Sequence, residues 1–335
     1  MLFSQIRIVA GHRYAYGLAI GAALLIATST SGYAQWKPDR TVEIVVGFAA
    51  GGGNDKSARV MQKIWKDTNL VDAVVVNKVG GGGALAYTYV SQKTGDGHAL
   101  AIAQAGLNTN HITGRSPLHY TDVTPLAFVG NEPVGLAVRA DSPYKTLKDF
   151  VTQLRKDPQS LSISVGSTRG AINHFTVAVL AKTAGVDPNK LKILVFGGGA
   201  ESVTNLLGGH IDAMSQAINN AIPHQKAGTM RILAISAPKR SPDLPDVPTF
   251  REQGFDVVLD GWTIFVGPKG MTPSQVAYWE QVFAKSVENP QWKQYLQQNA
   301  WEWGYRNSKD TAAYLKQDYD MSKRLLTELG MAKPQ

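Results

Sequence analysis

A glycine loop between a strand-like run and a helix-like run constrains the fold of this chain most. Residues 41–46 are largely apolar and β-branched, which predicts a buried strand. Residues 48–55 then read Phe-Ala-Ala-Gly-Gly-Gly-Asn-Asp, and apolar residues recur at helical spacing from Ala58 to Trp65. A strand, a tight turn and a helix start bring several backbone N–H groups to one point, where the helix dipole adds positive charge. We therefore expect this loop to bind an anion.

The first 34 residues read as a cleavable signal peptide. Arg7 and Arg13 precede the apolar run 17–27, and residues 32–34 offer small side chains for cleavage. This run is too short for a membrane helix, which needs about 20 apolar residues. We expect cleavage after Ala34 and a soluble periplasmic protein.

Charge and cysteine content exclude several classes of protein. Of the formal charge of +8, Arg7 and Arg13 supply two, which leaves +6 for the mature chain. The basic residues are scattered, so no nucleic-acid partner is expected. Without cysteine the fold must rest on its core alone, and about 300 residues suit two domains.

Strand-like and helix-like runs alternate along most of the chain, which predicts an α/β fold with mainly parallel sheets. The expected strands are 42–47, 72–76, 98–103, 161–165, 191–196, 211–214 and 231–236. The expected helices are 55–66, 83–93, 146–156, 171–184, 200–207, 217–227, 273–288, 290–299 and 309–327. Two long extended runs, 126–139 and 255–266, suit strands that cross between two domains.

Three further glycine loops follow expected strands, at residues 77–83, 166–170 and 196–200. Ligands of open parallel sheets bind at the carboxyl ends of strands. Glycine also relieves tight turns without any ligand, but four such loops together predict a binding cleft between domains.

Signals for catalysis are weak. The chain has no Walker A, G-x-S-x-G, G-x-G-x-x-G or H-E-x-x-H motif, and its histidines lack metal-ligand spacing, so neither metal nor cofactor is expected. Asp55 could cap a helix or contact a ligand, and His174 could brace a loop. A hydrolase or lyase using either residue remains the rival hypothesis, although no paired nucleophile and base is evident.

Several ordered motifs resemble the Bug family of extracytoplasmic receptors, the TctC-type binding components of tripartite tricarboxylate transporters. The likeness covers nearly all of the mature chain. The similar segments are the G-G-x-x-D loop in 42–59, Asn77-Lys78 with its glycines, the D-G-H-A-L run 96–100, L-L-G-G-H-I-D at 206–212, K-R-S-P-D-L-P-D-V-P-T at 239–249, and Trp262.

The resemblance implies a two-domain periplasmic binding protein of type II, or Venus-flytrap, fold. The implied domain I comprises residues 35–135 and 257–335, and domain II comprises 136–256. It also implies a monomeric receptor, not an enzyme, that holds a carboxylate on main-chain groups and delivers it to a membrane permease. A sensor that engages a signalling partner is the alternative use of the same fold.

The second half of the expected pocket departs from the family pattern. An arginine, Arg169, enters the loop 168–174, glycine replaces the family's lysine in 195–199, and Gln216 stands where aspartate is common. Arg169 could hold a second carboxylate bidentately. We therefore expect a di- or tricarboxylate, possibly aromatic. The expected ligand-binding residues are Phe48, Ala50, Gly52, Gly53, Asn54, Asp55, Gly81, Gly82, Gly83, Gln104, Ala105, Thr168, Arg169, Gly170, Ala171, His174, Gly197, Gly198, Gly199, Ser215 and Gln216.

Overall fold

The computed structural model describes residues 36–166, 169–196, 198–242 and 244–333. From Lys37 onward the chain forms one compact unit. The expected signal peptide, residues 1–34, lies outside the described residues. In the part of the chain that is described, no helix is both long and apolar enough to cross a bilayer.

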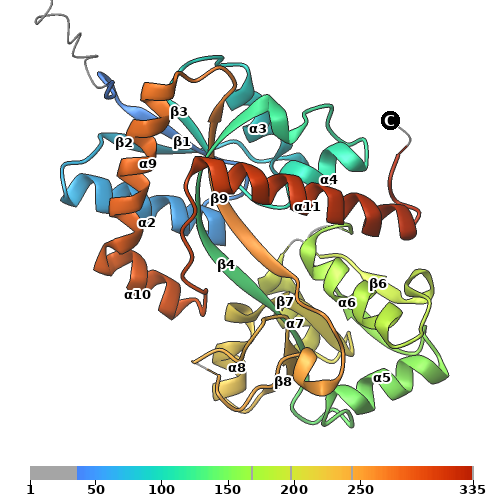
Figure 1. Cartoon of the computed structure of the whole chain (residues 1–335). Helices are drawn as coiled ribbons and strands as arrows, with labels where there is room; N and C mark the ends of the chain where they lie inside the picture. The colour runs from blue at the N-terminus through green and yellow to red at the C-terminus, as the bar shows by residue number, and fades with distance from the viewer. Residues whose placement is uncertain (1–35, 167–168, 197, 243, 334–335) are drawn as a thin grey trace, which may run out of the picture. The chain divides into compact units, whose positions relative to one another are not determined.

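The first sheet contains parallel strands, and helices connect these strands along the chain (Figure 1). These elements are β1 (Val42–Val46), α2 (Gly53–Asp67), β2 (Ala73–Asn77), α3 (Ala84–Ser91), β3 (Ala99–Ala103) and α4 (Gly106–Ile112). β1 lies between β2 and β3, and every residue of β3 is buried, which is why this strand reads as an apolar run. The helical spacing of Ala58, Met61 and Trp65 places all three side chains on the buried face of α2.

The second sheet follows the same alternating plan. Its strands and the helices that accompany them are α5 (Leu147–Lys156), β5 (Ser162–Ser164), α6 (Ile172–Thr183), β6 (Lys192–Leu194), α7 (Gly199–Leu207), β7 (Ala213–Ala217), α8 (Ile222–Lys226) and β8 (Met230–Ile235). β5 lies parallel to both β6 and β7. Phe150, Ile163 and Leu180 are fully buried in the core between this sheet and its helices.

Two long strands join the sheets: β4 (Val123–Arg139) and β9 (Asp260–Pro268). The strand order is β2-β1-β3-β9-β4-β7-β5-β6, and β8 pairs with β4 off this path. β4 and β9 pair antiparallel with each other and with their other neighbours, so they add antiparallel pairs to the parallel strands. Their mutual register shifts between Pro125 and Ala127 and between Phe128 and Gly130, as at β-bulges, which bend a strand. The crossing strands expected from the two extended runs are thus present, while the domain boundaries stay a prediction.

The chain ends in helices α9 (Pro273–Glu288), α10 (Pro290–Gln298) and α11 (Ser308–Glu328). In the aromatic cluster that packs α9 on α2, the Trp279 ring lies 5.5 Å from that of Trp65 and 5.9 Å from that of Phe283. α11 is tied to the rest through Asp318, which accepts hydrogen bonds from Asn108 of α4 and Trp262 of β9.

Two helices differ from the sequence-based prediction. α4 was not expected, because three of its buried residues are the polar Asn108, Thr109 and Asn110, which break the apolar pattern of a helix face. The expected helix 217–227 is instead a 3₁₀ turn at Ile218–Asn220 followed by α8, with Pro223 in the first turn of α8. Proline lacks the N–H that a continuous helix would need at this position.

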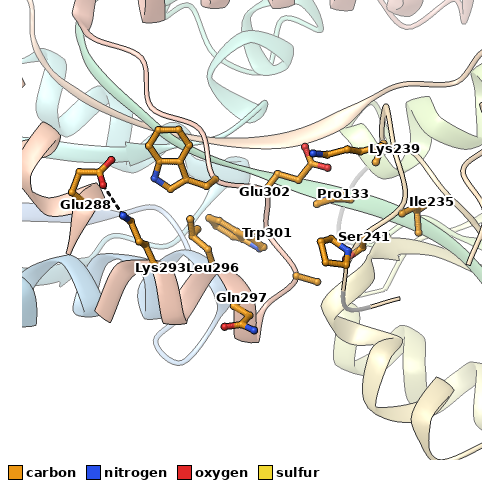
Figure 2. Close-up of a pocket in the computed structure, with 14 residues that line it drawn as sticks. Pro133, Ile235, Lys239, Ser241, Glu288, Lys293, Leu296, Gln297, Trp301 and Glu302 are labelled. Atoms are coloured by element: carbon orange, nitrogen blue, oxygen red, sulfur yellow. Dashed lines mark hydrogen bonds and ion pairs between the residues drawn. The ribbon is translucent and has the colours of Figure 1, made fainter. Parts of the chain in front are cut away.

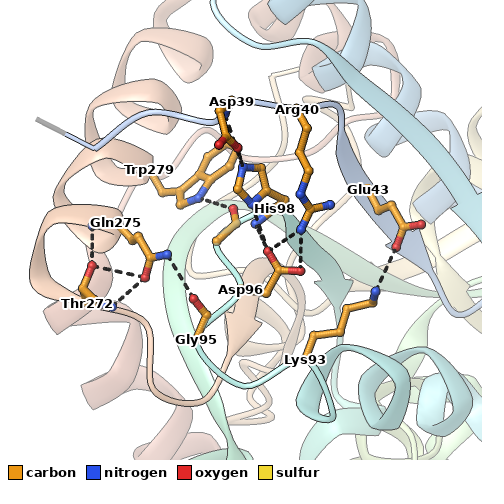
Figure 3. Close-up of polar contacts among 11 residues, drawn as sticks. Asp39, Arg40, Glu43, Lys93, Gly95, Asp96, His98, Thr272, Gln275 and Trp279 are labelled. Atoms are coloured by element: carbon orange, nitrogen blue, oxygen red, sulfur yellow. Dashed lines mark hydrogen bonds and ion pairs between the residues drawn. The ribbon is translucent and has the colours of Figure 1, made fainter.

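The Asp96-Gly97-His98 motif fastens the start of the unit and α9 to the first sheet (Figure 3). Both carboxylate oxygens of Asp96 accept from Arg40 at 3.0 Å, and one lies 2.9 Å from His98 Nδ1. The Trp279 indole donates to the Gly97 carbonyl at 3.0 Å. These contacts give the motif a structural role.

Candidate functional site

A cavity of about 140 Å³ lies where the two sheets and both crossing strands meet. Its lining comprises Phe48, Gly82, Gln104, Ala105, Gly106, Thr109, Asn110, Glu132, Val134, Ala171, Ile172, Asn173, Ala217, Gly261 and Trp262. The first sheet supplies the loops after β1 and β2 and the loop and helix after β3. The second sheet supplies the start of α6 and the end of β7, and β4 and β9 supply the floor between them. Drug-sized ligands occupy pockets of about 300–1,000 Å³, so this cavity suits a small solute.

Glycine lets the loops of the first sheet approach one another closely. A Cβ on Gly47 would lie 2.5 Å from the Gly83 Cα, and a Cβ on Gly106 would lie 2.2 Å from the Gly82 carbonyl oxygen. Gly82 also adopts the left-handed conformation, with φ +60°. Asn110 holds this loop by donating to the Gly81 carbonyl at 2.8 Å. Main-chain groups of neighbouring loops are therefore presented together at the cavity wall.

Asp55 braces the first glycine loop from inside the protein. Its carboxylate accepts from the Gly51 N–H at 2.8 Å, from Arg59 Nε at 2.8 Å and from Asn77 Nδ2 at 2.9 Å. Burial alone would raise the pKa of Asp55, but these hydrogen bonds outweigh it and lower the pKa to about 2. Gly52, not Asp55, occupies the N-cap of α2. Both oxygens of Asp55 are thus engaged by the protein, and Asp55 does not line the cavity.

The second-sheet wall is the first turn of α6. Ala171 is the N-cap, and Ile172 and Asn173 follow it along the cavity. The Asn173 side chain donates to Gln216 at 3.3 Å, and the Asn173 backbone carbonyl accepts from the Ser215 hydroxyl at 2.9 Å. The predicted site residues Ser215 and Gln216 therefore hold Asn173 in place at the cavity wall.

Arg169 and His174 stand beside this wall and do not line the cavity. The exposed Arg169 donates from Nη2 to the Ile193 carbonyl at 2.9 Å. His174 is buried, and its Nδ1 accepts from the Gly170 N–H at 3.0 Å. Burial, with a smaller contribution from the Arg169 charge, lowers the pKa of His174 to about 4. His174 therefore braces the loop as a neutral imidazole.

Five of the expected ligand-binding residues line the cavity: Phe48, Gly82, Gln104, Ala105 and Ala171. Thr168 and Gly197 lie outside the described residues. The others stand outside the lining: Ala50, Gly52, Gly53, Asn54, Asp55, Gly81, Gly83, Arg169, Gly170, His174, Gly198, Gly199, Ser215 and Gln216.

Sequence reasoning missed the part of the lining that comes from α4, the crossing strands, the first turn of α6 and the end of β7. These residues are Gly106, Thr109, Asn110, Glu132, Val134, Ile172, Asn173, Ala217, Gly261 and Trp262. Two signals could have found some of them. Glu132 is a lone acid inside an extended run, and Gly106 follows an expected strand much as the four glycine loops do.

Glu132 of β4 is held at the cavity by Trp301, whose indole N–H donates to Oε1 at 3.1 Å. Burial raises the pKa of Glu132 to about 7, although the hydrogen bond from Trp301 acts in the opposite direction. Glu132 is therefore close to half ionised at neutral pH.

A larger groove of about 760 Å³ lies beside Trp301, with α10 and the segment after it on one side and the residues that follow β8 on the other (Figure 2). Pro133, Ile235, Leu296 and Trp301 contribute to its largely apolar lining. No described residue of the four glycine loops lines this groove. The first two glycine loops contribute Phe48 and Gly82 to the smaller cavity, where they meet the start of α6. The smaller cavity is therefore the candidate solute site.

The sequence matches the tripartite tricarboxylate transporter family receptor, TctC, over residues 58–331. This chain belongs to the TctC family. The proteins of this family are periplasmic solute-binding receptors rather than enzymes.

Individual relatives agree with this assignment. A Cupriavidus necator protein, described as the UPF0065 protein in the gbd 5' region, is 29% identical over 95% of this chain and 96% of its own length. The periplasmic binding protein BugD is 27% identical, with a TM-score of 0.76 over 89% of this chain and 100% of BugD. MatC from Rhodopseudomonas palustris with bound malate is 26% identical, with a TM-score of 0.74 over 87% of this chain and 100% of MatC. The resemblance to Bug receptors and the two-domain receptor fold are thereby confirmed.

Proposed function

We propose that this TctC-family receptor binds a small organic carboxylate in the cleft cavity. The observation that carries the proposal is the lining itself, in which backbone groups of glycine loops meet side-chain amides and the first turn of a 12-residue helix. The full-length likeness to MatC, whose structure holds malate, supports the same class of solute.

The α6 wall offers the most direct means of binding an anion. The first amide groups of a helix have no partner within the helix, and the helix dipole adds partial positive charge there. Ala171, Ile172 and Asn173 place this end of α6 at the cavity. Gln104 adds a neutral side-chain amide from the opposite wall.

The expectation of a di- or tricarboxylate, possibly aromatic, stays a prediction. Arg169 is the residue expected to bind the second carboxylate, yet its Nη2 donates to a backbone carbonyl of β6. The groups that line the cavity therefore decide which chemical group the solute carries besides its first carboxylate.

The proposed route is uptake from the periplasm. The predicted signal peptide would export the chain, and a tripartite tricarboxylate-type permease would receive the solute. The transporter-receptor description of the family favours delivery to a permease over signalling.

Calorimetry on the mature chain with mono-, di- and tricarboxylates, amino acids and aromatic acids tests this function. A bound carboxylate should also raise the melting temperature through mass action. The proposal fails if none of these compounds binds while the chain is folded.

A further inference from the structure

The cavity lining contains one ionisable side chain, and that side chain is an acid. Among the described lining residues, Glu132 alone titrates, and no lysine, arginine or histidine is present. The undescribed positions within residues 37–333 are Ser167, Thr168, Gly197 and Asp243, none of which is basic. A second carboxylate on the solute would therefore find no cation in the lining, but would find another carboxyl group.

Glu132 has one oxygen fixed and one available. Oε1 accepts from the Trp301 indole at 3.1 Å, whereas Oε2 makes no hydrogen bond to the described residues. Gly261 lies opposite Glu132 in the β4–β9 register, and a Cβ there would stand 3.6 Å from Oε2. The missing side chain of Gly261 thus leaves room beside the unused oxygen.

The groups packed around Glu132 do not neutralise it. Tyr295 of α10 is kept protonated, because burial raises the pKa of Tyr295 to about 12. Asp318 of α11, behind the cavity residue Trp262, is a second acid. The Arg306 guanidinium stacks on the rings of Phe128 and Tyr314 at 4.5 and 4.3 Å.

We propose that Glu132 selects the charge of the solute, so that the receptor prefers a carboxylate bearing an ammonium group to a dicarboxylate of the same length. This inference rests on the proposed function. The helix start and the glycine loops bind the carboxylate, and Glu132 Oε2 binds the cation. A second carboxylate is rejected, because a like charge at a desolvated site is strongly unfavourable.

Because Glu132 binds and releases a proton, its role should also appear in how solute affinity changes with pH. A cationic group binds the ionised form of Glu132, so affinity for an amino carboxylate rises with pH through the pKa near 7 and then levels off. A dicarboxylate should show the opposite trend, because it requires protonated Glu132.

The experiment is calorimetry with three matched sets of probes, each with a monocarboxylate, its ω-amino derivative and its dicarboxylate. Butanoate, 4-aminobutanoate and succinate form the shortest set, and the next two are one and two carbons longer. In wild type above the pKa of Glu132, we expect the best amino carboxylate to bind at least about tenfold tighter than its dicarboxylate. Glu132→Gln, which retains an acceptor for Trp301, should abolish both the preference and the pH dependence.

Two further variants separate this role from a structural one. Glu288→Gln removes an equal charge outside the cavity, where Glu288 pairs with Lys293, and should change neither readout. Trp301→Phe removes the donor that lowers the pKa of Glu132, and should move the midpoint of the pH dependence upward.

The outcomes distinguish the two proposals. If no carboxylate binds, the proposed function and this inference both fail. If carboxylates bind but dicarboxylates bind tightest, or Glu132→Gln retains the wild-type order and pH profile, only the selection by Glu132 is overturned.

Discussion

At the scale of single residues, the site depends on charged groups that do not contact the cavity. Asp55 is 1% exposed and joins the loop after β1 to the end of β2 through Gly51 and Asn77. Its ion pair with Arg59 lies on the helix that begins at the loop. The acid in the G-G-x-x-D motif therefore shapes the loop from behind.

Asp55→Asn should destabilise the fold by about 2 kcal/mol at neutral pH, because a shift from 3.8 to about 2 corresponds to nearly two pKa units. The folded pKa is depressed, so this contribution is complete above pH 3.8 and is lost as pH falls toward 2. Urea unfolding of both proteins at a series of pH values measures it. A difference that stays constant on acidification would contradict the assignment.

His174 should make stability sensitive to pH in a higher window. Its folded pKa of about 4 lies below the ordinary value of 6.5, so neutral His174 stabilises the fold above pH 6.5 and this contribution is lost as pH falls toward 4. The slope should approach about 1.4 kcal/mol per pH unit. His174→Gln, which keeps an acceptor for Gly170, should lose this slope in the same unfolding series. An unchanged slope would show that His174 does not titrate with folding.

At the scale of elements, the close approach of two loops is what the sequence predicts least directly. Gly106 begins α4 and Gly82 precedes α3, yet no pattern along the chain shows that a Cβ on Gly106 would lie 2.2 Å from the Gly82 oxygen. Strand–loop–helix units are predictable, because apolar runs and glycine are local signals. Contacts between two such loops depend on tertiary structure.

Gly106→Ala should therefore weaken carboxylate binding by about tenfold or more, and should cost about 1–3 kcal/mol of stability through overpacking. Gly185→Ala is the matched control. Gly185 has φ +75°, and a Cβ added there would meet nothing within 4 Å, so alanine adds backbone strain away from the cavity. Calorimetry should show wild-type affinity for Gly185→Ala and a loss for Gly106→Ala, and equal affinities would reject the loop contact as a binding determinant.

The same limit explains α4 and Glu132. Asn108 of α4 is buried because it donates to Asp318, far away in sequence, so the helix lacks the apolar face by which helices are recognised. Glu132 interrupts an extended run whose apolar neighbours indicate a strand. The run predicts the strand correctly. The role of Glu132, however, depends on Trp301 and Gly261, which the fold places beside it.

At the scale of the whole unit, β4 is shared by the two sheets, pairing with β9 in one and with β7 and β8 in the other. The β4–β9 pairing ends at Pro133 and Asp260, next to the cavity residues Glu132 and Gly261. The strands that carry the floor of the site are thus the connection between its two walls.

This arrangement predicts that a carboxylate closes the receptor around itself, because a solute that contacts both walls stabilises their close approach. Solution scattering should give a smaller radius of gyration when the mature chain is saturated with the tightest binder of the carboxylate panel. Gly106→Ala, at a ligand concentration that saturates only wild type, should keep the larger radius. An unchanged wild-type radius at saturation would show that β4 and β9 act as a rigid floor, and that the solute enters a cavity whose walls are already in place.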